Sequence, residues 1–235
     1  MSTTVTLRKL NADRKLIDKE ISRLVNDIGR GEKQLIGIHR LDNQYMGIRT
    51  IEQFKTDCSA NWQKLNDLLI RRTYLNEKNM LAYGGLIESP DENSTFVVKV
   101  PKFVGLDKSS NDTETLTIAQ AIARKKWFET VLSEVVNTIR RHYIKVENDF
   151  NNTSNRLKNE LDAMLNSQFG PESTHTSKQR IEFKESIKSN YTLEIIDPIG
   201  LKDKVDNALS IVETYANTID SIISRATETT EVEID

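Results

Sequence analysis

Two clusters of cationic side chains are the part of this 235-residue sequence whose chemistry could serve a ligand. An arginine pair stands toward the end of one helical pattern, and three cations followed by a tryptophan stand near the start of another. Guanidinium and ammonium groups bind phosphate oxygens, and an indole ring beside a cation can stack on a planar ligand. The clusters predict a binding site for a small anionic molecule such as a nucleotide, formed by Arg71, Arg72, Arg124, Lys125, Lys126 and Trp127.

A second interpretation gives these residues no ligand. Cations near the C-terminus of a helix stabilise it through the helix dipole, which suits Arg71 and Arg72. Long cationic side chains also flank the apolar stripe of many helices, on a solvated or an intersubunit face. Because successive residues on a helix are about 100° apart, we expect Lys125 near the apolar stripe, with Arg124 and Lys126 on either side of it.

Catalytic and metal-binding patterns are missing from the sequence. It contains no phosphate-binding Gly-x-x-x-x-Gly-Lys-Ser/Thr loop, no Gly-x-Gly-x-x-Gly, no Gly-x-Ser-x-Gly and no His-Glu-x-x-His. Cys58 is the only cysteine, and His39, His142 and His175 do not have metal-ligand spacing. No residue set can be assigned acid, base and nucleophile roles. We therefore expect a protein that is not an enzyme and that carries no cofactor or metal.

The composition limits the partners further. With 33 basic and 35 acidic residues the net charge is −2, so no general attraction to nucleic acid is expected. No apolar run approaches the roughly 18 residues of a membrane span, and the N-terminus lacks the apolar core of a signal peptide. These features predict a cytoplasmic protein without membrane contact. A hydrophobic content of 37% with 29% charged residues is typical of long amphipathic helices.

The elements that must position the basic clusters are long helices. The longest, 115–165, has apolar residues mostly three, four or seven positions apart, with Thr117 and Gln120 as a capping box and Gly170-Pro171 as its stop. About 50 residues at 1.5 Å each make a rod of roughly 75 Å, which is longer than a domain of this size is wide. It must bend or extend into a partner. The polar run 148–155 is where we expect any break, and otherwise we expect a homo-oligomer.

The remaining elements complete a mainly α prediction, in which long antiparallel amphipathic helices carry a small β element. The β element comprises residues around 94–104 and a C-terminal strand, 229–234, as its partner. Residues 34–38 form a short strand or an ordered loop, and 191–196 a possible strand. We predict a helical core, 1–166, and a C-terminal segment, 167–235, whose strand packs back on that core. Apolar spacing predicts further helices at 7–28, 50–79, 177–189 and 201–225.

Two sequence motifs resemble a known family. Trp62 to Arg71 has the form Trp-x-x-Leu-x-x-Leu-x-x-Arg, and Leu116 to Lys125 has the form Leu-Thr-x-x-x-Ala-x-x-x-Lys. With an N-terminal helix and a β element, this order resembles the septicolysin-like small proteins of bacteria and tailed phages, over roughly residues 1–145. The chain departs from it after Gly84 and from Ser167 onward. The resemblance implies a multimeric, phage-encoded helical protein and supplies no mechanism.

Three functional hypotheses follow. The first is a non-catalytic homo-oligomeric binding protein, encoded by a phage, that acts as an anti-defence sponge for a nucleotide immune signal. The second is a virion-associated or assembly protein that uses its helices as struts. The third is a direct inhibitor that docks on a host enzyme. The sequence identifies neither the ligand nor the number of subunits.

Overall fold

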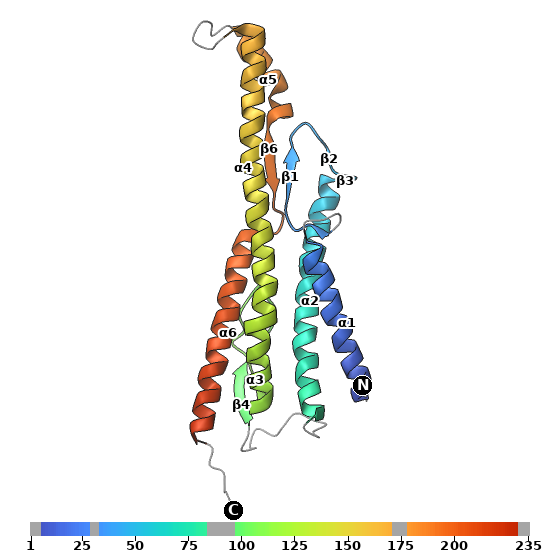
Figure 1. The fold of residues 1–235 in the computed structure, drawn as a ribbon, viewed down its shortest axis with the longest axis vertical. Helices are drawn as coiled ribbons and strands as arrows, with labels where there is room; N and C mark the ends of the chain where they lie inside the picture. Colours follow the sequence, from blue (N-terminus) through green and yellow to red (C-terminus); the bar gives the residue numbers. More distant parts are fainter. Residues whose placement is uncertain (1–5, 29–32, 84–96, 171–177, 230–235) are drawn as a thin grey trace, which may run out of the picture. The chain divides into compact units, whose positions relative to one another are not determined.

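The computed structural model describes residues 6–28, 33–83, 97–170 and 178–229. They form a mainly α fold with short antiparallel strands, which confirms the predicted fold class (Figure 1). The helical segments are α1 (Leu7–Asn26), α2 (Ile51–Tyr83), α3 (Ile118–Trp127), the π-helical η2 (Phe128–Leu132), α4 (Ser133–Phe169), α5 (Lys178–Ile187), the 3-10 segment η3 (Lys188–Tyr191) and α6 (Leu201–Thr229). The strands are β1 (Gly37–Arg40), β2 (Tyr45–Met46), β3 (Arg49–Thr50), β4 (Val97–Pro101), β5 (Thr113–Thr117) and β6 (Leu193–Ile196).

Internal contacts group the chain into two compact units. Unit 1 comprises residues 1–27, 62–140 and 202–235, and unit 2 comprises residues 28–61 and 141–201. Each unit therefore gathers segments that are distant in sequence, and α2 and α4 contribute to both. The division into 1–166 and 167–235 expected from the sequence stays a prediction.

In unit 1, α1 packs beside the C-terminal half of α2 (Figure 1). Thr6 caps α1 by accepting a hydrogen bond from the backbone N–H of Lys9, and the apolar stripe of the helix is buried. Polar contacts add to this packing, since the Asn79 amide donates to Asn11 over 3.0 Å. The buried residues of α1 are Leu10, Ile17, Ile21, Leu24 and Val25.

The strand predicted at the start of the β element is present as β4, and its predicted pairing with 229–234 stays a prediction. Among the described residues β4 pairs with β5, with Val98 opposite Leu116 and Val100 opposite Glu114. The predicted partner, 229–234, lies outside the described residues except for Thr229, which ends α6. Polar and β-branched residues dominate Thr113–Thr117, and this composition favours a strand. The long helix consequently begins at Ile118 and not at Thr115.

From Ile118 to Phe169 the chain is helical without a gap, through α3, η2 and α4. The predicted capping box is confirmed, since the Thr117 hydroxyl accepts from Gln120 N–H and the Gln120 side chain accepts from Thr117 N–H. Gly170, at φ 79°, ends the helix as expected.

The polar run 148–155, named as the place for any break, contains none. This run is regular α-helix, and the irregular turn of the long helix is η2 instead. Asn148, Asn151 and Asn152 are exposed, so water satisfies their side chains and they need not compete for backbone hydrogen bonds.

Unit 2 is built around two short antiparallel strands, β1 and β6, with Gly37 opposite Ile196 and Arg40 opposite Leu193 (Figure 1). Both of these strands were candidates from the sequence. The start of α2 carries a second capping box, in which Thr50 and Gln53 exchange hydrogen bonds of 3.0 and 3.2 Å.

Cys58 lies in a small hydrophobic core of unit 2 with Phe54 and Ile196. Burial raises the pKa of the Cys58 thiol to about 12. The side chain is fully buried and protonated at neutral pH, which fits the apolar packing role of a free cysteine.

Candidate binding site

A pocket of about 490 Å³ lies within unit 1. One wall is α1, a second is the helical run from the end of α3 into α4, and Arg72 of α2 lies between them. The volume is within the range of small-molecule sites, roughly 300–1,000 Å³. The pocket is lined by Asp18, Ile21, Ser22, Val25, Asn26, Arg72, Trp127, Thr130, Val131, Glu134, Val135 and Thr138.

Arg72 and Trp127 form the polar part of this pocket. The Arg72 side chain is buried, with its guanidinium carbon 4.6 Å from the centre of the Trp127 ring, and its Nε donates to Asp18. The Arg72 Nη1 and the Trp127 Nε1 are also buried and have no hydrogen-bond partner in the described part of the chain. An unsatisfied buried donor costs about 1–3 kcal/mol. Both side chains line the pocket, but these two N–H atoms have almost no accessible surface, so a ligand would reach them only if the side chains turned toward it.

The π-helical turn η2 lies at the same pocket. Insertions of this kind occur frequently at functional sites, because the extra residue shifts the side chains of one turn. Phe128 and Leu132 are completely buried, whereas Thr130 and Val131 are exposed and line the pocket. The irregular turn therefore separates a core face from a pocket face within five residues.

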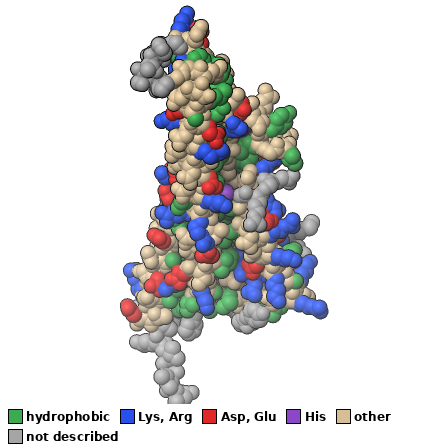
Figure 2. Space-filling model, turned by 45° about the horizontal axis from the view of Figure 1, so that its top comes forward, with side chains coloured by type: hydrophobic (Ala, Val, Ile, Leu, Met, Phe, Trp, Pro, Cys, Tyr) green, Lys and Arg blue, Asp and Glu red, His purple; other side chains and the backbone are tan. Residues whose placement is uncertain are grey.

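The other residues of the pocket lining are apolar at the buried floor and polar at the exposed rim. Ile21, Val25 and Val135 are buried, and the exposed rim includes Ser22, Asn26 and Thr130. Two carboxylates, Asp18 and Glu134, line the pocket with a single guanidinium, so the formal charge of its lining is −1. The charges of the whole chain are similarly mixed, and both signs are interspersed on the face drawn in Figure 2.

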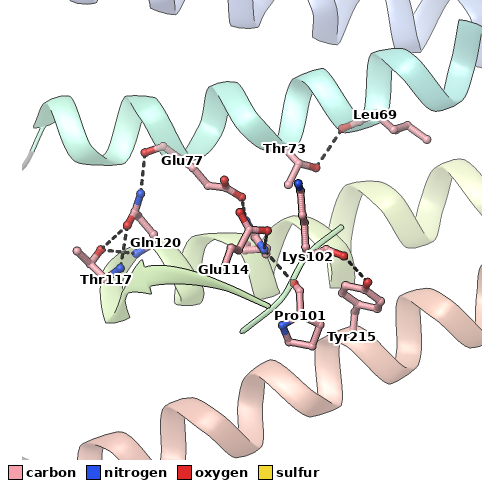
Figure 3. Close-up of polar contacts among 10 residues, drawn as sticks. Leu69, Thr73, Glu77, Pro101, Lys102, Glu114, Thr117, Gln120 and Tyr215 are labelled. Carbon is pink, nitrogen blue, oxygen red and sulfur yellow. Dashed lines mark hydrogen bonds and ion pairs between the residues drawn. The ribbon is translucent and has the colours of Figure 1, made fainter. Parts of the chain in front are cut away.

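Arg124 was expected beside the apolar stripe, but the structure buries it almost completely, at 1% exposure. Its guanidinium bonds to the Glu77 carboxylate, to Glu114 over 2.8 Å and to the carbonyl of Pro101 over 3.2 Å. Figure 3 labels three residues that bond to this guanidinium, namely Glu77 of α2, Glu114 of β5 and Pro101 of β4. The sequence prediction that Lys125 lies nearest the buried stripe was wrong, because the β4–β5 hairpin also needs a partner on this helix.

The two partners in this cluster have shifted acidities. Burial raises the pKa of the Glu77 carboxyl in spite of the adjacent Arg124. For Arg124, burial opposes the charge, but the carboxylates of Glu77 and Glu114 outweigh it, and the pKa of Arg124 is raised. Arg124 therefore belongs to a buried ion cluster with Glu77 and Glu114, and it does not line the pocket.

The other predicted residues are also outside the pocket. Arg71 and Lys126 are exposed. Lys125 bonds to Asp220 of α6 and lies 3.7 Å from Glu129, and its pKa is raised chiefly by the bond to Asp220. The structure therefore brings together Arg72 and Trp127 from the predicted set. Asp18 and Glu134 were missed, because no sequence pattern relates Asp18 to an arginine 54 positions away.

A second cavity, of about 610 Å³, lies in unit 2 around β1, β2 and β3. Its cationic side chains already have partners. Arg49 bonds to Asp57 over 2.7 Å, and Arg40 donates to the carbonyl of Asn190 over 3.1 Å. The unit 1 pocket is the stronger candidate, because its lining combines a buried guanidinium and an indole ring with an apolar floor.

No protein-family model matches the chain, and comparisons with curated proteins and with solved structures found no similar protein. The septicolysin-like resemblance therefore stays a hypothesis. Over the described ranges no helix is long and apolar enough to cross a membrane. The same ranges contain no group of three or more side chains suited to hold a metal ion.

Proposed function

We propose that this protein is a non-catalytic binding protein that captures a small molecule in the Arg72–Trp127 pocket. The observation that supports this most directly is the pocket lining, which combines the Arg72 guanidinium and the Trp127 indole with an apolar floor. Each of these two side chains has a buried N–H donor without a partner among the described residues. A ligand with an acceptor group would give a donor of Arg72 or Trp127 a partner once that side chain turns toward the pocket, and the apolar floor would hold the body of the ligand.

A nucleotide immune signal is the ligand that the basic clusters predicted, and sequestering it as a phage anti-defence factor remains one form of this proposal. The pocket geometry supports one acceptor group at Arg72 rather than a chain of phosphates. Arg124, Lys125 and Lys126 do not line the pocket, so they add no phosphate contacts there. The virion-assembly and enzyme-inhibitor roles stay hypotheses without a supporting contact.

The test is native mass spectrometry of the purified protein, with release of bound small molecules on denaturation. We expect a small molecule to co-purify, and we expect Trp127→Phe, which keeps an aromatic ring but removes the indole N–H, to lower its occupancy. Arg72→Met should lower it more, by about 10- to 100-fold in affinity, because a hydrogen bond to a charged group contributes roughly 1.5–3 kcal/mol.

Arg71→Met is the matched control, because Arg71 is the exposed neighbour of Arg72 and does not line the pocket. It should leave occupancy unchanged. Equal occupancy in the wild type and in both pocket variants, with helix content preserved, would contradict the proposal.

We further propose that the protein forms homo-oligomers through the β2–β3 hairpin. Tyr45 is 51% exposed and Ile48 is 92% exposed on this hairpin, so two large apolar side chains face solvent close together. Contact with a second copy would remove them from water.

We expect light scattering to give a molar mass that is a multiple of the monomer mass, and Ile48→Asp to shift it toward the monomer. Lys178→Asp, at a side chain that is 91% exposed on α5, is the control and should not change the mass. A wild-type protein that is monomeric at all concentrations would contradict this proposal.

A further inference from the structure

We propose that the exposed face of α1 binds duplex nucleic acid through its phosphate groups. This activity goes beyond the proposed function and does not need the Arg72–Trp127 pocket. The net charge of −2 averages over the whole chain and hides a local excess of positive charge. Leu7–Asn26 alone carries six lysine or arginine residues against three aspartate or glutamate residues. A helix of this charge attracts a polyanion even when the rest of the protein does not.

The exposed cations of α1 form a row along one face of the helix. This basic row consists of Arg8, Lys15, Lys19 and Arg23, all of them exposed. At 100° per residue the four positions fall within an arc of about 80°, and at 1.5 Å per residue the first and last are about 22 Å apart. The buried stripe of the helix lies on the opposite side. The row therefore faces solvent along most of the length of α1.

The acidic side chains of α1 lie beside the basic row and not within it. At 100° per residue, none of Asp13, Asp18 and Glu20 falls within the arc of the cations. Asp18 already bonds to Arg72 of α2. Glu20 lies 3.7 Å from Lys64, also of α2. Among the residues that the structure describes, no ion pair involves the first three cations of the row, so their charge is not neutralised by the fold.

The basic row lowers the stability of the free helix. Lys15, Lys19 and Arg23 are four residues apart, a spacing at which like charges repel each other. Arg8 stands in the first turn, which has no acidic residue, and the positive end of the helix dipole disfavours a cation there. Helix stability therefore does not account for this arrangement, whereas a bound polyanion would relieve the repulsion.

Duplex nucleic acid fits this face better than another protein or a membrane does. Interfaces with nucleic acid are strongly positive, whereas interfaces between proteins are depleted of lysine and rely on aromatic anchors. α1 contains no aromatic residue. Helices that lie on a membrane bury an apolar face in the lipid, but the apolar face of α1 is already covered within unit 1. Leu16 is exposed beside the row, but it is a single large apolar side chain.

The test is fluorescence anisotropy of a labelled DNA duplex of about 20 base pairs, over a series of salt concentrations. We expect a Kd of about 10⁻⁴–10⁻⁶ M at physiological salt, the usual range for contacts with phosphates alone. The logarithm of the association constant should fall by about 3.6 per decade of salt, which is 0.9 for each of four phosphates. A second duplex of different sequence should bind equally, because phosphates carry no sequence information.

The double variant Lys15→Gln, Lys19→Gln should bind at least about tenfold more weakly, with a salt slope smaller by about 1.8. It should resist urea at least as well as the wild type, because the repulsion along α1 is reduced. The control is the double variant Lys158→Gln, Lys178→Gln, in which two exposed lysines of α4 and α5 are lost with the same change in net charge. The control should keep the wild-type slope.

Failure of the wild type to bind either duplex at about 50 mM salt overturns this proposal. Equal losses of affinity in the α1 variant and in the control also overturn it, because the total charge and not the basic row would then set the affinity. Tighter binding to phosphatidylserine vesicles or to polyglutamate than to the duplex would assign the row to a membrane or to an acidic protein instead. None of these results changes the expected occupancy of the pocket, which Arg72→Met tests separately.

Discussion

Replacing Arg124 by methionine is expected to lower the free energy of unfolding by about 3–5 kcal/mol, the usual cost of removing one partner of a buried ion pair. The side chain is 1% exposed and contacts α2, through Glu77, and the hairpin, through Glu114 and Pro101. Methionine has a similar length, so the loss arises from electrostatics more than from a cavity. The carboxylate of Glu77, in a side chain only 10% exposed, would be left without its cation.

Urea denaturation followed by circular dichroism measures this effect. Lys126→Met on the exposed side of the same helix is the control, with an expected change within about 0.5 kcal/mol. The double variant Arg124→Met, Glu77→Met should recover most of the loss, because the uncompensated carboxylate is removed. A loss below about 1 kcal/mol for the single variant would show that the cluster does not stabilise the fold.

Replacing Phe128 by alanine should lower the free energy of unfolding by about 3–5 kcal/mol. The cause here is lost packing, which is independent of the charges around Arg124. Phe128 is completely buried in η2, where its ring lies 5.2 Å from that of Phe103 and 5.7 Å from that of Tyr215. These residues belong to the β-hairpin region, the π turn and α6, so one ring joins three segments of unit 1. Truncation removes apolar contacts and two aromatic pairs, and leaves a cavity.

The comparison variant is Phe128→Leu, which keeps most of the volume and should cost less than half as much. Ile122→Ala, at a residue that is 50% exposed on α3, should be nearly neutral. All three are measured by urea denaturation under the same conditions. Equal losses for alanine and leucine at position 128 would mean that cavity volume does not set the cost.

Local patterns in the sequence determined most of the helices. The apolar spacing of α1 and α6 predicts amphipathic helices because only one face of each is buried, and that periodicity is visible within a single segment. The capping residues at both ends of the long helix were also predicted from short stretches of sequence. Thr117 and Gln120 satisfy each other within three residues, and Gly170 ends the helix through its own backbone conformation.

The sequence also named the two residue types that matter at the candidate site, an arginine and a tryptophan. It did not place Arg72 against Trp127, nor Asp18 beside Arg72, because those contacts depend on how α1, α2 and α3 pack. For the same reason the sequence did not predict that Arg124 is buried while Lys125 is only partly buried. Helical spacing gives the order of side chains around one helix, but neighbouring elements decide which face is covered.

Pairing and helix irregularity were likewise decided by the tertiary structure. β4 could have paired with any segment of suitable composition, and in the described structure it pairs with β5, the next strand along the chain, across residues 102–112. The polar run at 148–155 stayed helical because it faces water, whereas the π turn formed at Phe128, where a buried ring and pocket residues share one turn. Hydrogen bonds between near neighbours are determined by the sequence alone, while charge burial, strand pairing and pocket lining depend on which distant segments the folded chain brings together.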